Sequence, residues 1–102
     1  MKKAYLFLAT GFEEVEALTV CDVLRRGNVD CKLVSVTGDY EVKSSHNVAV
    51  RADLLFDKQS FSDADLLILP GGIPGTPNLK AHKGGIPLEN INKRSLFISI
   101  ND

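Results

Sequence analysis

The sequence has little excess charge, few cysteines and no long apolar run, and each of these shortages excludes a class of protein. Its 12 basic and 13 acidic residues give a net charge of −1, which offers no electrostatic basis for binding nucleic acid or an anionic membrane. Two cysteines do not make a disulfide framework, so a cytoplasmic location is expected. No apolar run approaches the roughly 20 residues of a membrane span. One small domain, or a piece of one, is expected over 1–102.

An alternation of strand, helix and strand is expected over the first third of the chain. The apolar segment 3–9 is too short for the core of a signal peptide and predicts a buried strand. A helix is expected over 13–26, because acids crowd its first turn, two arginines end it and Gly27 follows. A second strand at 30–36 completes a unit whose order implies a right-handed parallel crossover.

The apolar residues of this helix do not decide which of its sides is buried. Val15, Leu18 and Val23 form one set at helical spacing, and Val20 and Leu24 form another. The choice between the two sets decides which side of the helix contacts the sheet.

The rest of the chain predicts short strands separated by turns. Residues 37–41 carry turn chemistry, and 47–51 alternate weakly like a short strand. A buried strand is expected at 66–69 and a last strand at 95–100. Between 73 and 92, prolines and glycines leave room only for short helical turns.

These elements predict an α/β fold with a mostly parallel sheet and flanking helices. A parallel sheet needs cover on both faces, but the sequence offers one clear helix, at 13–26. We therefore expect either that a partner chain covers the second face or that the chain is a fragment of a longer domain.

Chemistry in such a sheet is expected at the carboxyl ends of the strands, where the strand order reverses. If the strands at 3–9 and 66–69 are neighbours, the acids of 13–16 face the glycines at 71–72 across this crevice. A carboxylate there can hold or transfer a proton, and glycine N–H groups can stabilise an oxyanion. A nucleophile is expected after the strand at 95–100, but neither a thiol nor a hydroxyl follows it.

Three stretches of the sequence carry a resemblance to a known family. The stretches GFEEVEALTVCDVLRRGNVDCKLVSV, VKSSHNVAVRAD and DADLLILPGGIPGTPNL resemble the ThiJ/PfpI family, in the branch of the Parkinson-linked protein deglycase. The resemblance is dense over 1–83, whereas 84–102 diverge. It implies a flavodoxin-like fold that is incomplete in its C-terminal half, and a homodimer. It also implies a cysteine-dependent hydrolase or lyase of small carbonyl or glycated compounds.

The resemblance also implies roles for individual residues. Glu16 matches the glutamate that hydrogen-bonds the reactive cysteine, and Gly72 matches the glycine whose N–H lines the oxyanion pocket. His46 lies where a basic residue reaches the site of the dimer partner. Asn101 stands near the position of the expected cysteine, so the chain is expected to be C-terminally truncated and inactive alone.

Two other outcomes remain open at this point. The chain can act as a non-catalytic dimerising interaction module, or it can be a non-functional fragment. Within the family, the residues do not distinguish deglycase, glyoxalase, amidase or protease, chaperone and redox-sensor roles.

The remaining candidate residues favour structural roles. Cys21 in mid-helix and Cys31 at a strand start are expected to be buried packing thiols. Glu13 and Glu14 are expected to be solvated charges at the helix start. The histidines lack metal-ligand spacing and no nucleotide-binding motif occurs, so neither a metal nor another cofactor is expected.

Overall fold

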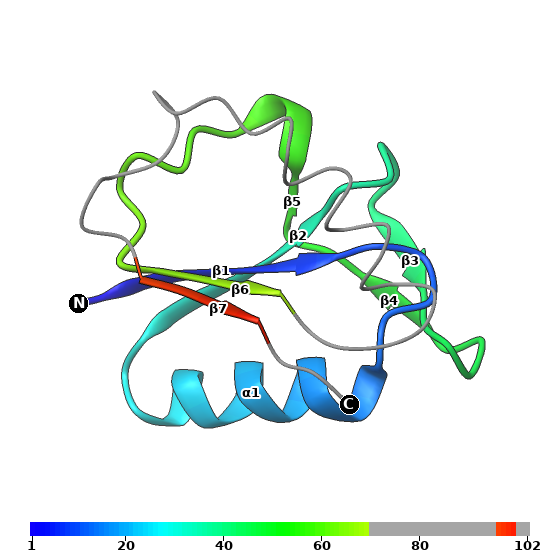
Figure 1. Ribbon diagram of the computed structural model, residues 1–102, viewed down its shortest axis with the longest axis horizontal. Helices are drawn as coiled ribbons and strands as arrows, with labels where there is room; N and C mark the ends of the chain where they lie inside the picture. Colours follow the sequence, from blue (N-terminus) through cyan, green and yellow to red (C-terminus); the bar gives the residue numbers. More distant parts are fainter. Residues whose placement is uncertain (70–95, 100–102) are drawn as a thin grey trace.

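The computed structural model describes residues 1–69 and 96–99 (Figure 1). In chain order the elements are β1 (Lys3–Leu8), α1 (Glu14–Arg26), β2 (Asp30–Ser35), β3 (Glu41–Lys43), β4 (Ala49–Arg51), β5 (Leu54–Leu55), the 3₁₀ turn η1 (Phe56–Lys58), β6 (Leu66–Leu69) and β7 (Leu96–Ser99). The ranges predicted for the helix and for the four long strands agree with these bounds to within one residue.

The described strands of the main sheet lie in the order β5-β2-β1-β6-β7, and every neighbouring pair is parallel. The chain moves from β1 to β2 on one side and later returns to the other side of β1 through β6. This order is that of a flavodoxin-like sheet, and the predicted α/β class is confirmed. The reversal of strand order lies between β1 and β6.

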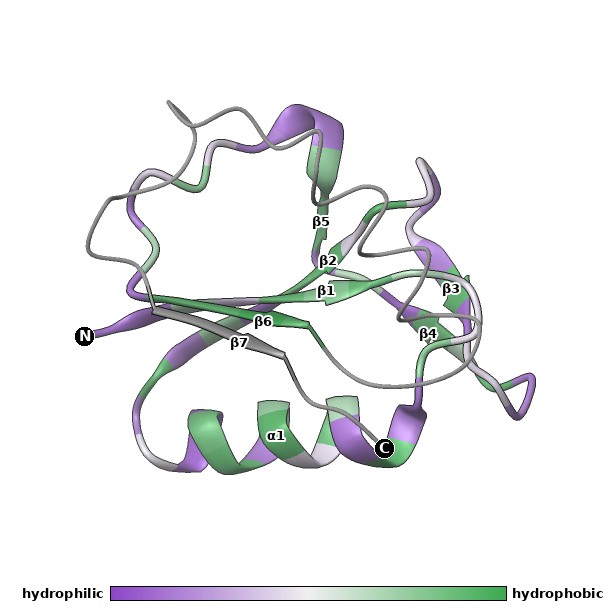
Figure 2. Cartoon of the chain, viewed as in Figure 1, coloured by the Kyte–Doolittle hydropathy of each residue, from purple (hydrophilic) through white to green (hydrophobic). Residues whose placement is uncertain are grey.

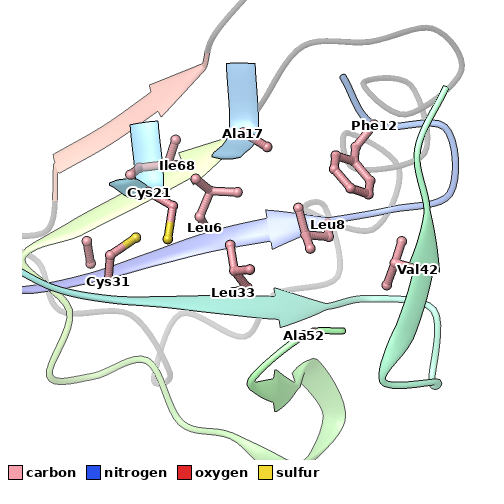
Figure 3. Packing of buried hydrophobic residues seen from close by; sticks show 11 residues of the cluster. Leu6, Leu8, Phe12, Ala17, Cys21, Cys31, Leu33, Val42, Ala52 and Ile68 are labelled. Atoms are coloured by element: carbon pink, nitrogen blue, oxygen red, sulfur yellow. The ribbon is translucent and has the colours of Figure 1, made fainter. Parts of the chain in front are cut away.

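One face of the sheet packs against α1 (Figures 1 and 3). The contact is made by small helix residues, because Ala17 and Cys21 are buried and Val20 and Leu24 pack partly buried beside them. The strands contribute aliphatic side chains such as Leu6 to this contact. The second of the two apolar sets in the helix is therefore the buried one.

The first set of apolar residues lies on the outer side of the helix. Val15, Leu18 and Val23 are 67%, 38% and 59% exposed. The side with Val20 and Leu24 packs against the sheet because it also carries Ala17 and Cys21 at helical spacing, which completes one apolar face.

The connection between β5 and β6 lies on the opposite face of the sheet (Figure 1), and its aromatic side chains pack there against those of β1. The ring of Phe61 lies 5.0 Å from that of Tyr5 and 5.3 Å from that of Phe7, both in edge-on geometry. Phe56 of η1 packs against the same group. The sequence indicated too little cover for one face, and within the described residues this irregular connection supplies cover that was not anticipated.

A small antiparallel hairpin of β3 and β4 stands beside the carboxyl end of β1. Its strand at Ala49–Arg51 lies within the predicted range, but its partner begins at Glu41, where the sequence predicted the end of a turn. Figure 2 shows the tip of the hairpin as hydrophilic, in contrast to the hydrophobic β6. Ser44 at this tip bridges to Phe12 just after β1, which fixes the hairpin next to the start of α1.

Candidate functional site at the carboxyl edge of the sheet

The geometric condition for the predicted site is met by the strands. β1 and β6 are neighbours in parallel register, with Leu6 opposite Ile68, and β7 runs parallel on the far side of β6. The carboxyl ends of these strands therefore share one edge of the sheet. Gly72 and Asn101, two of the predicted site residues, lie outside the described residues.

The turn after β1 leads directly into the first turn of α1. Gly11 has a positive φ of 91°, a conformation that favours glycine, and its N–H donates to the carbonyl of Lys43 at 2.9 Å. Glu13 then caps the helix, since its Oε1 accepts from the N–H of Val15 at 2.9 Å. A carboxylate at this place also interacts favourably with the helix dipole.

Glu14 is tied to the hairpin, so the prediction that it is a solvated charge is wrong. Its side chain is 13% exposed. The hydroxyl of Ser44 donates to Oε1 of Glu14 at 2.5 Å, and Nδ1 of His46 lies 2.8 Å from Oε2. The Ser44 hydrogen bond is the main cause that lowers the pKa of Glu14 to about 2, and the hydrogen bond of His46 adds to it.

His46 lies at the tip of the hairpin, where its side chain is 71% exposed. The hydrogen bond to Glu14 raises the pKa of the imidazole, which favours the charged ring. His46 thus holds the hairpin to α1 of its own chain. Its expected role beside a dimer partner stays a prediction.

Glu16 lies in the first turn of α1, at the helix end that faces the carboxyl edge of β1. Its side chain is partly buried, next to the buried Ala17. The role of Glu16 beside a reactive thiol stays a prediction. The approach of Glu16 to Gly72 stays a prediction, because Gly72 is outside the described range.

Glu13, Glu14 and His46 are also the described residues closest to a metal-binding arrangement. Each offers one ligand atom, and these atoms lie within 4.8 Å of one another. Both oxygens of Glu14 are already engaged by Ser44 and His46. These contacts make the cluster an ion pair between Glu14 and His46 beside the helix cap of Glu13.

Both cysteines are buried free thiols, as predicted, with exposures of 5% for Cys21 and 1% for Cys31. Cys31 pairs with Ala4 at the amino end of β1, and Cys21 packs over the sheet from the middle of α1. Neither thiol lies where a nucleophile at the carboxyl edge would be.

Comparison with known proteins decides the family. A family model described as the DJ-1/PfpI family matches residues 2–93. The chain belongs to the DJ-1/PfpI family. The resemblance to the ThiJ/PfpI family, stated from the sequence, is thereby confirmed.

The chain is shorter than the members of the DJ-1/PfpI family that it matches. Protein DJ-1 homolog B of Arabidopsis thaliana is 40% identical over 93 residues, which are 91% of this chain and 20% of the relative. The Parkinson disease protein 7 homolog of Danio rerio is 34% identical over 79 residues, which are 76% of this chain and 42% of the relative. The chain thus spans less than half the length of these two curated relatives.

Solved structures of the DJ-1 superfamily share the fold. A mutant of a DJ-1 superfamily protein from Salmonella typhimurium has a TM-score of 0.76 at 37% identity, covering 79% of this chain and 44% of that chain. Oxidized Toxoplasma gondii DJ-1 has a TM-score of 0.76 at 28% identity, covering 97% and 55%. In the part of the chain that the structure describes, no helix is both long and apolar enough to cross a membrane.

Proposed function

We propose that this chain forms the acidic and oxyanion-binding side of a DJ-1/PfpI-type site for small carbonyl or glycated compounds, and that alone it does not turn them over. Family membership and the neighbouring β1 and β6 support the proposal. So does the start of α1 at the carboxyl edge, which carries Glu16.

The observation that carries the proposal is the position of the two cysteines. They are all the cysteines of the sequence, and Cys21 and Cys31 lie in the core between α1 and the sheet, away from the carboxyl edge. A cysteine-dependent reaction at that edge therefore needs a thiol that neither Cys21 nor Cys31 supplies. Two free buried thiols also support a cytoplasmic location as part of this proposal.

The chemistry follows from what each group can do at that edge. A thiolate adds to the carbonyl carbon of the substrate, and the carbonyl oxygen takes the negative charge. The carboxylate of Glu16 hydrogen-bonds the thiol and holds its proton. The N–H of Gly72 stabilises the oxyanion. This chain supplies the second and third groups and lacks the first.

Methylglyoxal consumption by the purified chain, without added thiol, tests this proposal. We expect a rate equal to that of buffer. Turnover that Glu16→Ala abolishes and the exposed-carboxylate control Glu41→Ala retains would contradict the claim of inactivity. Turnover that is lost in Cys21→Ala would identify Cys21 as the nucleophile, and this would contradict the proposal.

The outer side of α1 favours a second candidate, a homodimerising interaction module. Val15, Leu18 and Val23 expose apolar side chains along one side of the helix, and burying such a surface favours association. Light scattering after size exclusion should give the mass of a dimer for the wild type and of a monomer for Leu18→Glu. Lys58→Glu, in η1 on the opposite face of the sheet, should stay dimeric. A strictly monomeric wild-type chain would contradict this candidate.

A further inference from the structure

The two thiols of the core face one another across the contact between α1 and the sheet. Figure 3 shows the sulfur atoms of Cys21 and Cys31 side by side, one descending from the helix and the other rising from β2. Both belong to the same buried cluster, and the thiols are near enough to shift the pKa of each other in opposite directions. Packing alone requires only that each be apolar and small, so the pairing of two sulfurs is an additional feature.

We propose that Cys21 and Cys31 are an oxidation site, at which a small peroxide converts the two thiols into an intramolecular disulfide between α1 and β2. The inference is independent of the proposed function, because the pair lies beneath the helix and away from the carboxyl edge. The turn between the two elements is short, so the disulfide closes a small loop and leaves the outer side of α1 unchanged.

The surroundings of the pair distinguish the two thiols. Arg25, one turn after Cys21, donates from Nε to the carbonyl of Cys31 at 3.0 Å, and its Nη2 lies 3.0 Å from Oδ2 of Asp53. The guanidinium is therefore held near the sulfurs by its contacts with Cys31 of β2 and with Asp53, which lies just before β5. A fixed cation at this place favours a thiolate over a thiol.

The same surroundings assign the order of reaction. The hydrogen bond from Cys31 is the main cause that lowers the pKa of Cys21 to about 7, and the charge of Arg25 adds to it. That hydrogen bond and burial raise the pKa of Cys31. Cys21 is also the more exposed of the two, at 5% against 1%. Cys21 is therefore the attacking thiolate and Cys31 the thiol that resolves it.

The chemistry balances with hydrogen peroxide as the oxidant. The Cys21 thiolate attacks one peroxide oxygen, the O–O bond breaks, hydroxide leaves and a sulfenic acid forms. The sulfur of Cys31 then attacks the sulfur of Cys21, the S–O bond breaks, and the hydroxyl group leaves as water with the proton of Cys31. The hydroxide takes up the proton that Cys21 had lost. The two thiols are oxidised by two electrons, and the peroxide is reduced to water.

Peptide mapping of the full wild-type chain tests the proposal without any variant. Trypsin cleaves after Arg25 and Arg26, so the cysteines fall into the peptides Ala4–Arg25 and Gly27–Lys32. After peroxide treatment of the reduced, folded chain, we expect the intact mass to fall by about 2 Da. We also expect the two peptides to be linked without reductant and separate with dithiothreitol. A folded chain that yields no linked pair, or only links between molecules, would overturn the proposal.

Two variants separate the roles of the sulfurs. In Cys31→Ala the reaction should stop at the sulfenic acid of Cys21, which dimedone traps, whereas Cys21→Ala should give no adduct at Cys31. Arg25→Gln should slow the oxidation of Cys21 severalfold, and the distant control Lys58→Gln should leave the rate unchanged. Equal adducts at either cysteine would contradict the assigned order.

The equilibrium between the dithiol and the disulfide shows whether the fold, and not only closeness in the sequence, favours the bond. In glutathione buffers of graded ratio, the pair should be oxidised under more reducing conditions in the folded chain than in urea, because the fold holds the sulfurs together. The reverse order would show that the fold opposes the bond, and the proposal would fall.

Discussion

The face of the sheet under α1 and the opposite face are filled by different kinds of side chain. β1 turns Leu6 and Leu8 toward the helix and Tyr5 and Phe7 toward the other side. The helix meets its face through small residues, Ala17 among them. The opposite face is met by large rings from an irregular connection.

The difference shows how the cover determines the residues beneath it. A regular helix can lie close to a sheet along its whole length, so small residues at its contact complete a dense layer. An irregular connection touches the sheet at few points, so each point needs a large side chain such as Phe61 to fill the space. The two faces therefore respond differently to changes of volume.

Among substitutions on the two faces, removing the ring of Phe61 should lower the free energy of unfolding the most. Phe61→Ala should lower the free energy of unfolding by about 3–5 kcal/mol, because the ring is buried and contacts three other rings. Urea unfolding followed by circular dichroism measures the loss. Lys58→Ala, exposed in the same connection, should change stability by less than about 0.5 kcal/mol. Similar values for both variants would show that the connection is not part of the core.

Adding volume under the helix should have the next largest effect. Ala17 is fully buried, so Ala17→Leu should lower the free energy of unfolding by about 1–3 kcal/mol, because a close helix cannot accommodate the added atoms without shifting. Thr19→Leu, exposed on the same helix, serves as the matched control in the same urea experiment. A neutral Ala17→Leu would mean that the helix contact is loosely packed.

Removing the hydroxyl of Tyr5 on the aromatic face should have a smaller effect on stability, and this effect should shrink at alkaline pH. The hydroxyl of Tyr5 donates to Oδ1 of Asp63 at 2.8 Å, so Tyr5→Phe should cost about 1 kcal/mol near neutral pH. Burial is the main cause that raises the pKa of Tyr5 from 10.0 to about 12. The stability from this shift is fully present below pH 10 and is lost as the pH rises through 12.

Urea unfolding at neutral and at alkaline pH separates these contributions. The wild type should lose an increment of stability at alkaline pH that Tyr5→Phe lacks, and Tyr40→Phe should behave as the wild type does. An equal alkaline loss in Tyr5→Phe would assign the effect to other groups.

The contacts of Glu14 with Ser44 and His46, at the rim of the helix face, should have the smallest effect on stability. The contribution of Glu14 should be lost at acid pH. The lowered pKa of Glu14 means that its contribution is present above 4.5 and is lost as the pH falls toward 2. The raised pKa of His46 means that its contribution is present below 6.5 and is lost as the pH rises through the raised value. Both contributions are therefore complete between pH 4.5 and 6.5.

The pKa of Glu14, measured from carboxyl chemical shifts over a pH titration, reports directly on its hydrogen bond with Ser44. Ser44→Ala should raise the pKa of Glu14, because it removes the largest cause of the shift. Ser62→Ala, a hydroxyl on the connection to β6, should leave that pKa unchanged. An unchanged Glu14 pKa in Ser44→Ala would contradict the hydrogen bond.

The elements of this fold were predictable where a local pattern was strong. Apolar runs bounded by turn residues predicted β1 and β6, and their expected adjacency is confirmed. The capped helix was equally clear. Its buried face was not, because the set with Val15 and Leu18 satisfies helical spacing as well as the set that packs. The structure selects the set that shares its side of the helix with the buried Ala17 and Cys21.

The rim of the candidate site was predictable only in part, because its contacts join distant parts of the chain. Glu14 and Ser44 are 30 residues apart, and no short pattern relates them. Family resemblance pointed to Glu16, whereas the described contacts point to its neighbour Glu14. The pairing of Cys21 with Cys31 was missed for the same reason, since each residue alone predicts only burial.

The central position of β1 has a consequence for how the native state opens. This strand is paired along both edges, by β2 and by β6, and is covered on both faces. Its backbone amides can therefore meet solvent only when the whole molecule unfolds, so in hydrogen-exchange measurements Leu6 and Phe7 should be among the last to gain deuterium. Amides of the hairpin at Val42 and Val50, which pair with each other in a sheet of two strands among the described residues, should exchange through a local opening that leaves β1 protected.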